Sequence, residues 1–376
     1  MGYLIKHQNK PVLRFELIEN TADPIVKITW VTSEPKWLPH DLRVSDEGLG
    51  HWISRRTIPK NRAFVHNFLA KCGLNINRPM DVIGVSKGLS LNDVYWVVEE
   101  DFDGTFEAYN LYENRFSNVL ALIAFTGFGS SVRSSLASSP EFTTNGMLPK
   151  CWRRISGKVY LYKGGTSGAS NTGFEPYSEV YAAEIAKVMG VHAIDYKLTK
   201  WKGILCSFCE LFTSLSVSYV PVGRLVKTGG MKAVRAFYES LGPEFVDALN
   251  EMIVFDAVVC NQDRHFGNFG VLIDNETNEI MAPAPLFDHG NSLFNFAGRD
   301  DLLSEEAFDA YVSAVRPAVY NDFIEEAKMV MTEQNREQVR RLLTYDLKKN
   351  PRYNVPDDRF RLIAKTVKRR ARMLLE

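Results

Sequence analysis

The sequence is poor in cysteine, in net charge and in long apolar runs. Its 376 residues include only five cysteines, and Lys plus Arg equal Asp plus Glu at 45 each. The odd and sparse cysteines argue against a disulfide scaffold. The balanced charge gives no electrostatic footprint for direct binding of DNA or RNA. No apolar run reaches the length of a membrane span, and the first residues carry no signal-peptide hydrophobic region, so we expect a cytoplasmic protein without membrane contact.

Patterns of several common metal and nucleotide sites are also missing. Cys206 and Cys209 have C-x-x-C spacing, but residues 203–212 have the composition of a strand. Residues three apart on a strand point to opposite faces, so we interpret both cysteines as small buried hydrophobic residues. The sequence lacks the H-x-x-x-H spacing of a zinc hydrolase and the G-x-x-x-x-G-K-[ST] pattern of a Walker A loop.

A polar loop between two apolar segments stands out against this background. Residues 261–268 follow the apolar run 252–259 and precede the apolar residues 269–273. Catalytic groups often lie in loops held by buried elements. Charged side chains at the mouth of a buried segment also need an explanation, because desolvating them is costly unless they are paired. Residues 271–274 and 279–281, joined by a polar turn, predict a hairpin. The two legs of this hairpin should bring Asp288 back beside Asn268.

Asp263, Asn268 and Asp288 together form a set with a defined chemistry. Carboxylate and amide oxygens are ligands that Mg²⁺ accepts together with phosphate oxygens. Asp263 would then orient and deprotonate a hydroxyl nucleophile. A D-x-x-x-x-N motif followed by a later Asp is the layout of protein-kinase-like phosphoryl transfer. Each motif alone occurs by chance or in ordinary turns, so it is the complete set that favours catalysis.

The motifs N-x-D-R-H-x-x-N-F at residues 261–269 and P-L-F-D at residues 285–288 resemble those of the HipA-like kinases, a bacterial branch of the protein-kinase-like superfamily. The resemblance covers roughly residues 140–345. It implies that Asp263 is the catalytic Asp and that Asn268 and Asp288 bind Mg²⁺. Asp288 is followed by His-Gly and not by Phe-Gly, so ordinary activation-loop control is not expected. We interpret His265 as a brace that holds the loop through buried hydrogen bonds.

The segment before the loop fits a nucleotide-binding region. Gly146 and Lys150 lie in a turn ahead of the strand 158–163, where HipA-like kinases have a Gly-containing loop. Backbone N–H groups in such a turn approach phosphates, although Pro149 removes one donor. An ordinary surface turn is the alternative for this segment.

Lys163 is the candidate phosphate ligand of the predicted strand. Leu161 and Lys163 share one face of the strand, so Leu161 could touch a nucleotide base while Lys163 reaches the phosphates. The alternative is a strand-end lysine that reaches into water. A helix is predicted to begin near Ser178 and to end at Gly190. Either of two acids on it, Glu179 and Glu184, could pair with Lys163, and the resemblance favours Glu179.

These features predict an α+β, two-lobed protein-kinase-like fold with a β-rich N-lobe and a helical C-lobe. We expect an accessory N-terminal region at 1–128 packed on the N-lobe, the N-lobe itself at 129–213 and the C-lobe at 214–376. A helix at 61–72 belongs to the first region, and the Ser-rich stretch 129–139 is interpreted as a linker, with phosphoacceptor serines as the alternative. C-lobe helices are expected at 305–315, 320–331, 335–343 and 358–375. The basic side chains of the last are interpreted as a solvated face, with a docking face as the alternative.

We therefore expect an ATP- and Mg²⁺-dependent protein kinase of the HipA-like type that phosphorylates Ser or Thr. The resemblance implies a toxin–antitoxin role with a DNA-binding antitoxin as partner, and it makes Thr143 and Thr144 candidate autophosphorylation sites. A small-molecule or lipid kinase would use the same residues. A noncatalytic, kinase-like binding module is the alternative from another functional class.

Overall fold

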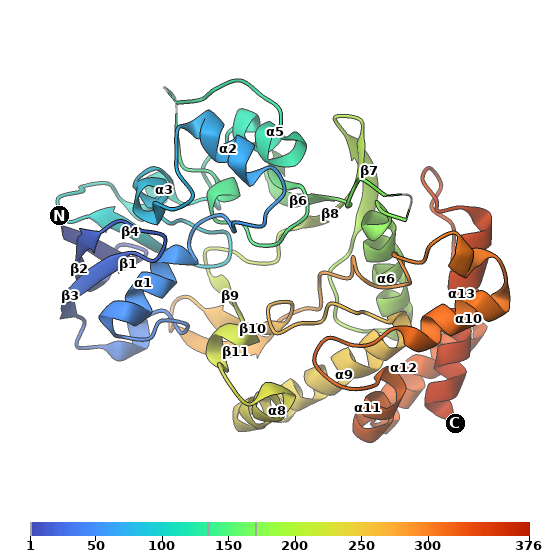
Figure 1. The fold of residues 1–376 in the computed structure, drawn as a ribbon. Coiled ribbons are helices and arrows are strands. Elements are labelled where there is room, and N and C mark those ends of the chain that lie inside the picture. The colour runs from blue at the N-terminus through green and yellow to red at the C-terminus, as the bar shows by residue number, and fades with distance from the viewer. Residues whose placement is uncertain (1, 134–135, 170) are drawn as a thin grey trace. The chain divides into compact units, whose positions relative to one another are not determined.

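Figure 1 shows the computed structural model, which describes residues 2–133, 136–169 and 171–376. The chain forms two compact units. The first contains Met1–Tyr162, Glu210–Val220 and Leu272–Met281, and the second contains Lys163–Cys209, Pro221–Val271 and Ala282–Glu376. The domain boundaries expected after residues 128 and 213 stay predictions.

The first unit contains a four-stranded sheet of order β3-β2-β1-β4, formed by β1 (Gly2–His7), β2 (Lys10–Glu19), β3 (Ile25–Val31) and β4 (Tyr95–Glu99). The pairs β1–β2, β1–β4 and β2–β3 are antiparallel. Side chains of α1 (Asp46–Ser54) and α3 (Pro79–Ser86) share a buried cluster with those of the strands, including Phe15 and Trp52. This cluster is a core that the N-terminal region forms from its own residues.

A second cluster of the first unit surrounds Phe142. It packs α2 (Val65–Cys72) against α5 (Asn118–Thr126), and the short α4 (Phe106–Tyr109) contributes to a neighbouring cluster. Helix α2 starts four residues later than predicted and ends, as predicted, before Gly73, whose φ of 72° suits a glycine. The strands β5 (Lys150–Ile155) and β6 (Lys158–Gly164) are sheet neighbours, which confirms the predicted strand.

The Ser-rich stretch 129–139 is partly bonded to the first unit. Ser134 and Ser135 lie outside the described residues. Ser131 donates a hydrogen bond to the carbonyl of Lys71 at 3.1 Å, and Ser138 donates to that of Ser86 at 3.0 Å. The described part of this stretch is therefore held against the helices and is not a free linker.

The second unit is mostly helical. Its elements include α6 (Glu175–Met189), the antiparallel pair β7 (Lys197–Trp201) and β8 (Ile204–Glu210), α7 (Val222–Leu225), α8 (Gly230–Leu241) and α9 (Pro243–Val259). Residues 252–259 of α9 are all buried, and α11 (Phe323–Val330) and α13 (Asp357–Leu375) pack on this helix. Cys206 and Cys209 are both buried in β8, as interpreted. In the described part of the chain, no helix is both long and apolar enough to span a bilayer.

The hairpin predicted after the polar loop is confirmed. Strands β10 (Gly270–Asp274) and β11 (Glu279–Pro283) are neighbours in a three-stranded sheet of order β11-β10-β9, where β9 is Val217–Pro221. The amide of Asn278 closes the turn on the carbonyl of Asp274 at 2.7 Å. The four helices predicted after residue 300 are present as α10 (Glu305–Ala314), α11, α12 (Glu333–Thr344) and α13, with ends that shift by up to three residues.

Two details of the helices correct the sequence analysis. Helix α6 begins at Glu175, because Pro176 fits the first turn of a helix, where its missing N–H costs nothing. Ser178, near which the helix was predicted to begin, is therefore inside the helix. On α13, Arg359 and Arg370 are buried and donate to the carbonyls of Phe294 and Ala257 at 2.9 and 2.5 Å. The prediction of a solvated basic face was wrong for these two side chains.

Candidate functional site

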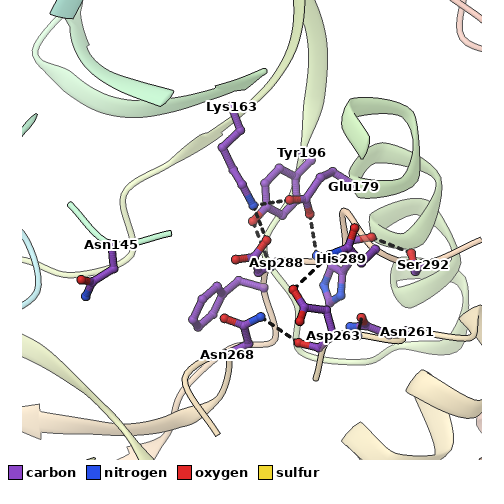
Figure 2. A network of polar contacts seen from close by, with 12 residues as sticks. Asn145, Lys163, Glu179, Tyr196, Asn261, Asp263, Asn268, Asp288, His289 and Ser292 are labelled. Atoms are coloured by element: carbon purple, nitrogen blue, oxygen red, sulfur yellow. Dashed lines mark hydrogen bonds and ion pairs between the residues drawn. The ribbon is translucent and has the colours of Figure 1, made fainter. Parts of the chain in front are cut away.

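A buried lysine of the second unit lies between two carboxylates (Figure 2). Lys163 stands at the end of β6, and its side chain is only 5% exposed. Its Nζ donates to Oε1 of Glu179 and, at 2.6 Å, to Oδ1 of Asp288. Glu179 and Glu184 both lie on α6, and the acid that pairs with Lys163 is Glu179.

The charges in this group are unbalanced. Burial alone lowers the pKa of Lys163, but the carboxylates of Asp288 and Glu179 more than offset this and raise it overall. Burial and the charge of Asp288 raise the pKa of Glu179, against the opposing effect of Lys163. Two carboxylates around one ammonium leave an excess negative charge in a poorly solvated place. A further cation at the exposed side of Asp288, whose side chain is 32% accessible, would relieve it.

The backbone of Asp288 adopts a left-handed conformation with φ of 59°. Asp tolerates this region better than most residues. Three hydrogen bonds hold the turn: the Asp288 amide donates to the Tyr196 hydroxyl at 3.3 Å, the His289 amide donates to Oε2 of Glu179 at 2.7 Å, and the carbonyl of Phe287 accepts from Arg264 at 2.7 Å. Glu179 thus binds Lys163 with one oxygen and the loop of Asp288 with the other.

Arg264 connects this turn to the loop of Asp263. Its guanidinium is fully buried and donates to both carboxylate oxygens of Asp256, at 2.9 and 3.1 Å. It also donates at 2.9 Å to the carbonyl of Asn268 and at 2.7 Å to that of Phe287. One side chain therefore joins the two segments that the predicted hairpin was expected to bring together.

His289 completes the buried network. Its Nδ1 lies 3.1 Å from Nη2 of Arg264, and the ring packs edge-on against Phe255. Burial, together with the charge of Arg264, keeps the pKa of His289 well below its ordinary value. The ring is therefore neutral at physiological pH and accepts the arginine hydrogen bond at Nδ1.

Three amide side chains position Asp263, and Figure 2 labels two of them, Asn261 and Asn268. Its backbone N–H donates to Oδ1 of Asn261 at 3.1 Å, and its carbonyl accepts from Nδ2 of Asn268 at 2.9 Å. Nδ2 of Asn291 donates to its Oδ2 at 3.0 Å, which fixes the rotation of the carboxylate. Because Asn268 uses its nitrogen on the loop, its side-chain oxygen is directed elsewhere and can serve as a ligand.

His265 does not have the predicted role. Its side chain is exposed, and its Nδ1 accepts a hydrogen bond from the Gly267 amide at 3.0 Å. The buried brace of the loop is its neighbour Arg264. No function was predicted for Asp256, although a single acid inside the apolar run 252–259 indicates that a buried cation accompanies it.

The remaining predicted residues belong to the first unit. Gly146 has φ of 93°, and the ammonium of the buried Lys150 lies directly against it. Leu161 is half-buried and packs on a cluster that includes Trp152 and Val159. The structure describes these residues only within their own unit, so their part in nucleotide binding stays a prediction.

Both candidate autophosphorylation sites have engaged hydroxyl groups. Thr143 is buried and donates at 2.8 Å to the carbonyl of Leu89. Thr144 donates at 2.6 Å to the carbonyl of Pro140 and accepts from Nε1 of Trp152 at 2.8 Å. Phosphorylation of either residue requires that this segment first opens.

No protein-family model matches the sequence, and no curated protein does either. Among solved structures, the chain is similar to HipA of the Shewanella oneidensis toxin–antitoxin system, which was solved with HipB and operator DNA. The two are 11% identical, the match covers 98% of this chain and 96% of that one, and the TM-score is 0.56. The Helicobacter pylori proinflammatory kinase CtkA is 16% identical over 60% of this chain and 91% of its own, with a TM-score of 0.47. The chain therefore has the mixed α/β fold of HipA, and the resemblance to the HipA-like kinases that the motifs indicated holds at the level of the fold.

Proposed function

We propose that the chain is an ATP- and Mg²⁺-dependent protein kinase of the HipA-like type that phosphorylates Ser or Thr. The observation that carries the proposal is the buried contact of Lys163 with Glu179 and Asp288, in the same unit as Asp263 and Asn268. Burying a lysine in a protein interior costs free energy unless its charge is paired with an acid or a ligand. A phosphotransferase uses such a lysine to hold the phosphates of its nucleotide.

The residues present fit a magnesium ion. Asp288 offers a partly exposed carboxylate in a turn held by three hydrogen bonds, and Asn268 offers an amide oxygen. Mg²⁺ is usually bound by one or two such protein groups together with phosphate oxygens and water. When bound, it neutralises charge that develops on the transferred phosphoryl group.

The protein side chains then have separate tasks. Lys163 exchanges its ion pair with Asp288 for a contact with the phosphates. It keeps its ion pair with Glu179, which positions the ammonium group. Asp263 accepts the proton of the acceptor hydroxyl. The hydroxyl oxygen forms the new bond to the γ-phosphorus of ATP while the bond from this phosphorus to the β–γ bridging oxygen breaks and ADP leaves. Asn291 keeps the carboxylate of Asp263 oriented for this step. Catalysis of this kind is mostly positioning and electrostatics, so small displacements are costly.

Transfer of radiolabelled phosphate from γ-labelled ATP to protein acceptors tests the proposal. Asp263→Ala and Asp288→Ala should each abolish transfer while the fold is retained. Asp288→Asn is a sharper variant, since Asn tolerates the left-handed backbone and removes only the charge. Asp247→Ala, which removes an exposed acid of α9 in the same unit, is the matched control and should leave transfer unchanged. Near-normal transfer by an Asp263 or Asp288 variant refutes the assignment.

The acceptor and the partner belong to the proposal as well. The HipA structure contains HipB and operator DNA. By analogy we propose a DNA-binding antitoxin partner and a cytoplasmic location for this chain. Copurification with the product of an adjacent gene would test the partner. A panel of protein and small-molecule acceptors separates a protein kinase from a small-molecule or lipid kinase, and an ATP titration with and without Mg²⁺ separates both from a noncatalytic binding module.

Autophosphorylation at Thr143 or Thr144 remains part of the same proposal. Mass spectrometry of the purified chain after incubation with MgATP should find phosphate in this segment. Since both hydroxyl groups are bonded in the structure, the modification should be slow and should accelerate in conditions that loosen the loop. A spectrum without phosphate between residues 130 and 150 would exclude it.

A further inference from the structure

A buried arginine of the N-terminal region, Arg62, contacts the Gly-containing loop from inside the first unit. It lies just before α2 and is 3% exposed. Its Nη1 donates to the carbonyl oxygens of Thr144, Asn145 and Gly146 at 3.4, 3.1 and 3.1 Å. Its Nη2 donates to the carbonyl of Lys150 at 3.3 Å. One side chain thus donates hydrogen bonds to four carbonyl groups of a loop that is more than 80 residues away in sequence.

This arrangement fixes the direction in which the loop's amides point. In a trans peptide unit the C=O and N–H groups point to opposite sides. The carbonyls of residues 144, 145 and 146 point inward to Arg62, so the N–H groups of Asn145, Gly146 and Met147 point outward. All three residues are exposed. Consecutive amides that face the same way form a concave site that binds anions.

Neighbouring contacts support this orientation. The Ala63 amide donates to the carbonyl of Met147 at 2.8 Å, which extends the inward row of carbonyl groups by one residue. Pro149 comes after the three outward amides, so its missing N–H does not affect them. Gly146 supplies the positive φ of 93° in the middle of the row, a conformation that suits glycine.

The buried charge acts in the same direction as the amides. Burial lowers the pKa of Arg62 to about 10, and the nearby carboxylate of Glu141 opposes this decrease. The guanidinium is therefore charged at neutral pH. A positive charge behind a row of amides in a poorly solvated place adds to the attraction for a phosphate group on the other side.

We propose that Arg62 is a positioning residue for nucleotide binding, which holds residues 144–147 so that the outward amides of Asn145, Gly146 and Met147 contact an anionic phosphate. The proposal rests on the proposed function. It concerns only how the loop is held and which ligand group the loop recognises.

Binding of MgATP and of adenosine to the full chain tests it by calorimetry. Because adenosine lacks phosphates, Arg62→Lys and Arg62→Met should weaken MgATP binding about tenfold, equivalent to about 1.4 kcal/mol, and leave adenosine binding unchanged. The rate at saturating ATP should change much less than the KM for ATP. Arg133→Met is the matched control, because this exposed arginine of the same unit donates to the carbonyl of Ala70 and not to the loop.

Hydrogen exchange provides a second measurement that does not depend on activity. The amide of Ala63, which donates to the carbonyl of Met147, should exchange faster in Arg62→Lys than in the unaltered chain, because this hydrogen bond depends on the position of the loop. This comparison does not require that Arg62→Met folds. An equal loss of MgATP and adenosine affinity, or unchanged MgATP affinity with unchanged exchange, overturns the inference. If the unaltered chain binds no MgATP, it is the proposed function that fails, whereas normal MgATP binding by the variants refutes the role of Arg62 alone.

Discussion

Replacing Arg264 by methionine should separate what the buried network does for stability from what it does for activity. Arg264 and Asp256 are both fully buried and joined by two hydrogen bonds. Burial raises the pKa of Asp256, and the arginine opposes this increase. Removing one partner of such a pair leaves an uncompensated charge, which costs about 3–5 kcal/mol. This cost is a large part of the free energy of unfolding of a domain, which is roughly 5–15 kcal/mol.

The double variant Asp256→Leu/Arg264→Met removes both charges at similar volume. Replacing a buried pair by apolar side chains is often neutral for stability. We therefore expect most of the lost free energy of unfolding to return. Activity should not return, because the carbonyls of Asn268 and Phe287 lose the donor that they share in the native chain.

Urea unfolding followed by circular dichroism, together with the transfer of radiolabelled phosphate, measures the two effects. Arg340→Met is the control, since this arginine of α12 forms only exposed ion pairs with Glu333 and Glu337 and its loss should leave the unfolding midpoint unchanged. A loss below about 1 kcal/mol for Arg264→Met would contradict the reasoning about the buried charge. Full activity of the double variant would show that the shared donor is dispensable.

Three further predictions rest on single contacts. Glu179→Gln keeps the hydrogen-bonding shape but removes the charge that holds Lys163, so kcat/KM for ATP should fall about 100-fold while the fold is retained. Asn291→Ala releases the carboxylate of Asp263 and should lower kcat about tenfold with little change in the KM for ATP, whereas an equal change in both would argue against an orienting role. Burial lowers the pKa of His7 to about 4 from its ordinary 6.5. Between pH 6.5 and 4, the imidazole of His7 is therefore protonated in the unfolded chain and neutral in the folded chain. Up to about 3 kcal/mol of the free energy of unfolding should be lost as pH falls from 6.5 to 4. In His7→Phe, the unfolding midpoint should depend less on pH between 6.5 and 4. An unchanged dependence would exclude His7 as the cause of the loss of stability.

Local sequence signals predicted several elements of both units well. Gly190 ended α6 where a left-handed C-terminal residue was expected, and the polar turn between apolar segments marked the hairpin of β10 and β11. These are short-range rules, in which the residues that decide the structure lie beside one another. The start of α6 was misplaced because Ser178 and Pro176 both signal a helix start, and the proline effect prevailed.

Contacts between distant segments were not predictable in the same way. In the loop 261–268, no periodicity tells which of Arg264 and His265 points inward, and the choice depends on Asp256 in the preceding helix. The contact of Arg62 with residues 144–150 likewise joins segments that no local pattern connects.

Helix α13 contained a signal that its basic composition obscured. Arg359 and Arg370 are 11 residues apart, close to three helical turns, so they share the stripe of Leu362, Val367 and Leu374. Charged residues on an apolar stripe indicate buried partners. The carbonyls of Phe294 and Ala257 are those partners.

The left-handed backbone of Asp288 restricts how this position can change over generations. Asparagine and glycine fit the same φ, and the codons of aspartate and asparagine differ by a single base. A descendant of this gene can therefore lose the acid in one step and keep an intact turn. Under the proposed function, inactive members of its lineage should carry asparagine or glycine there more often than any β-branched residue.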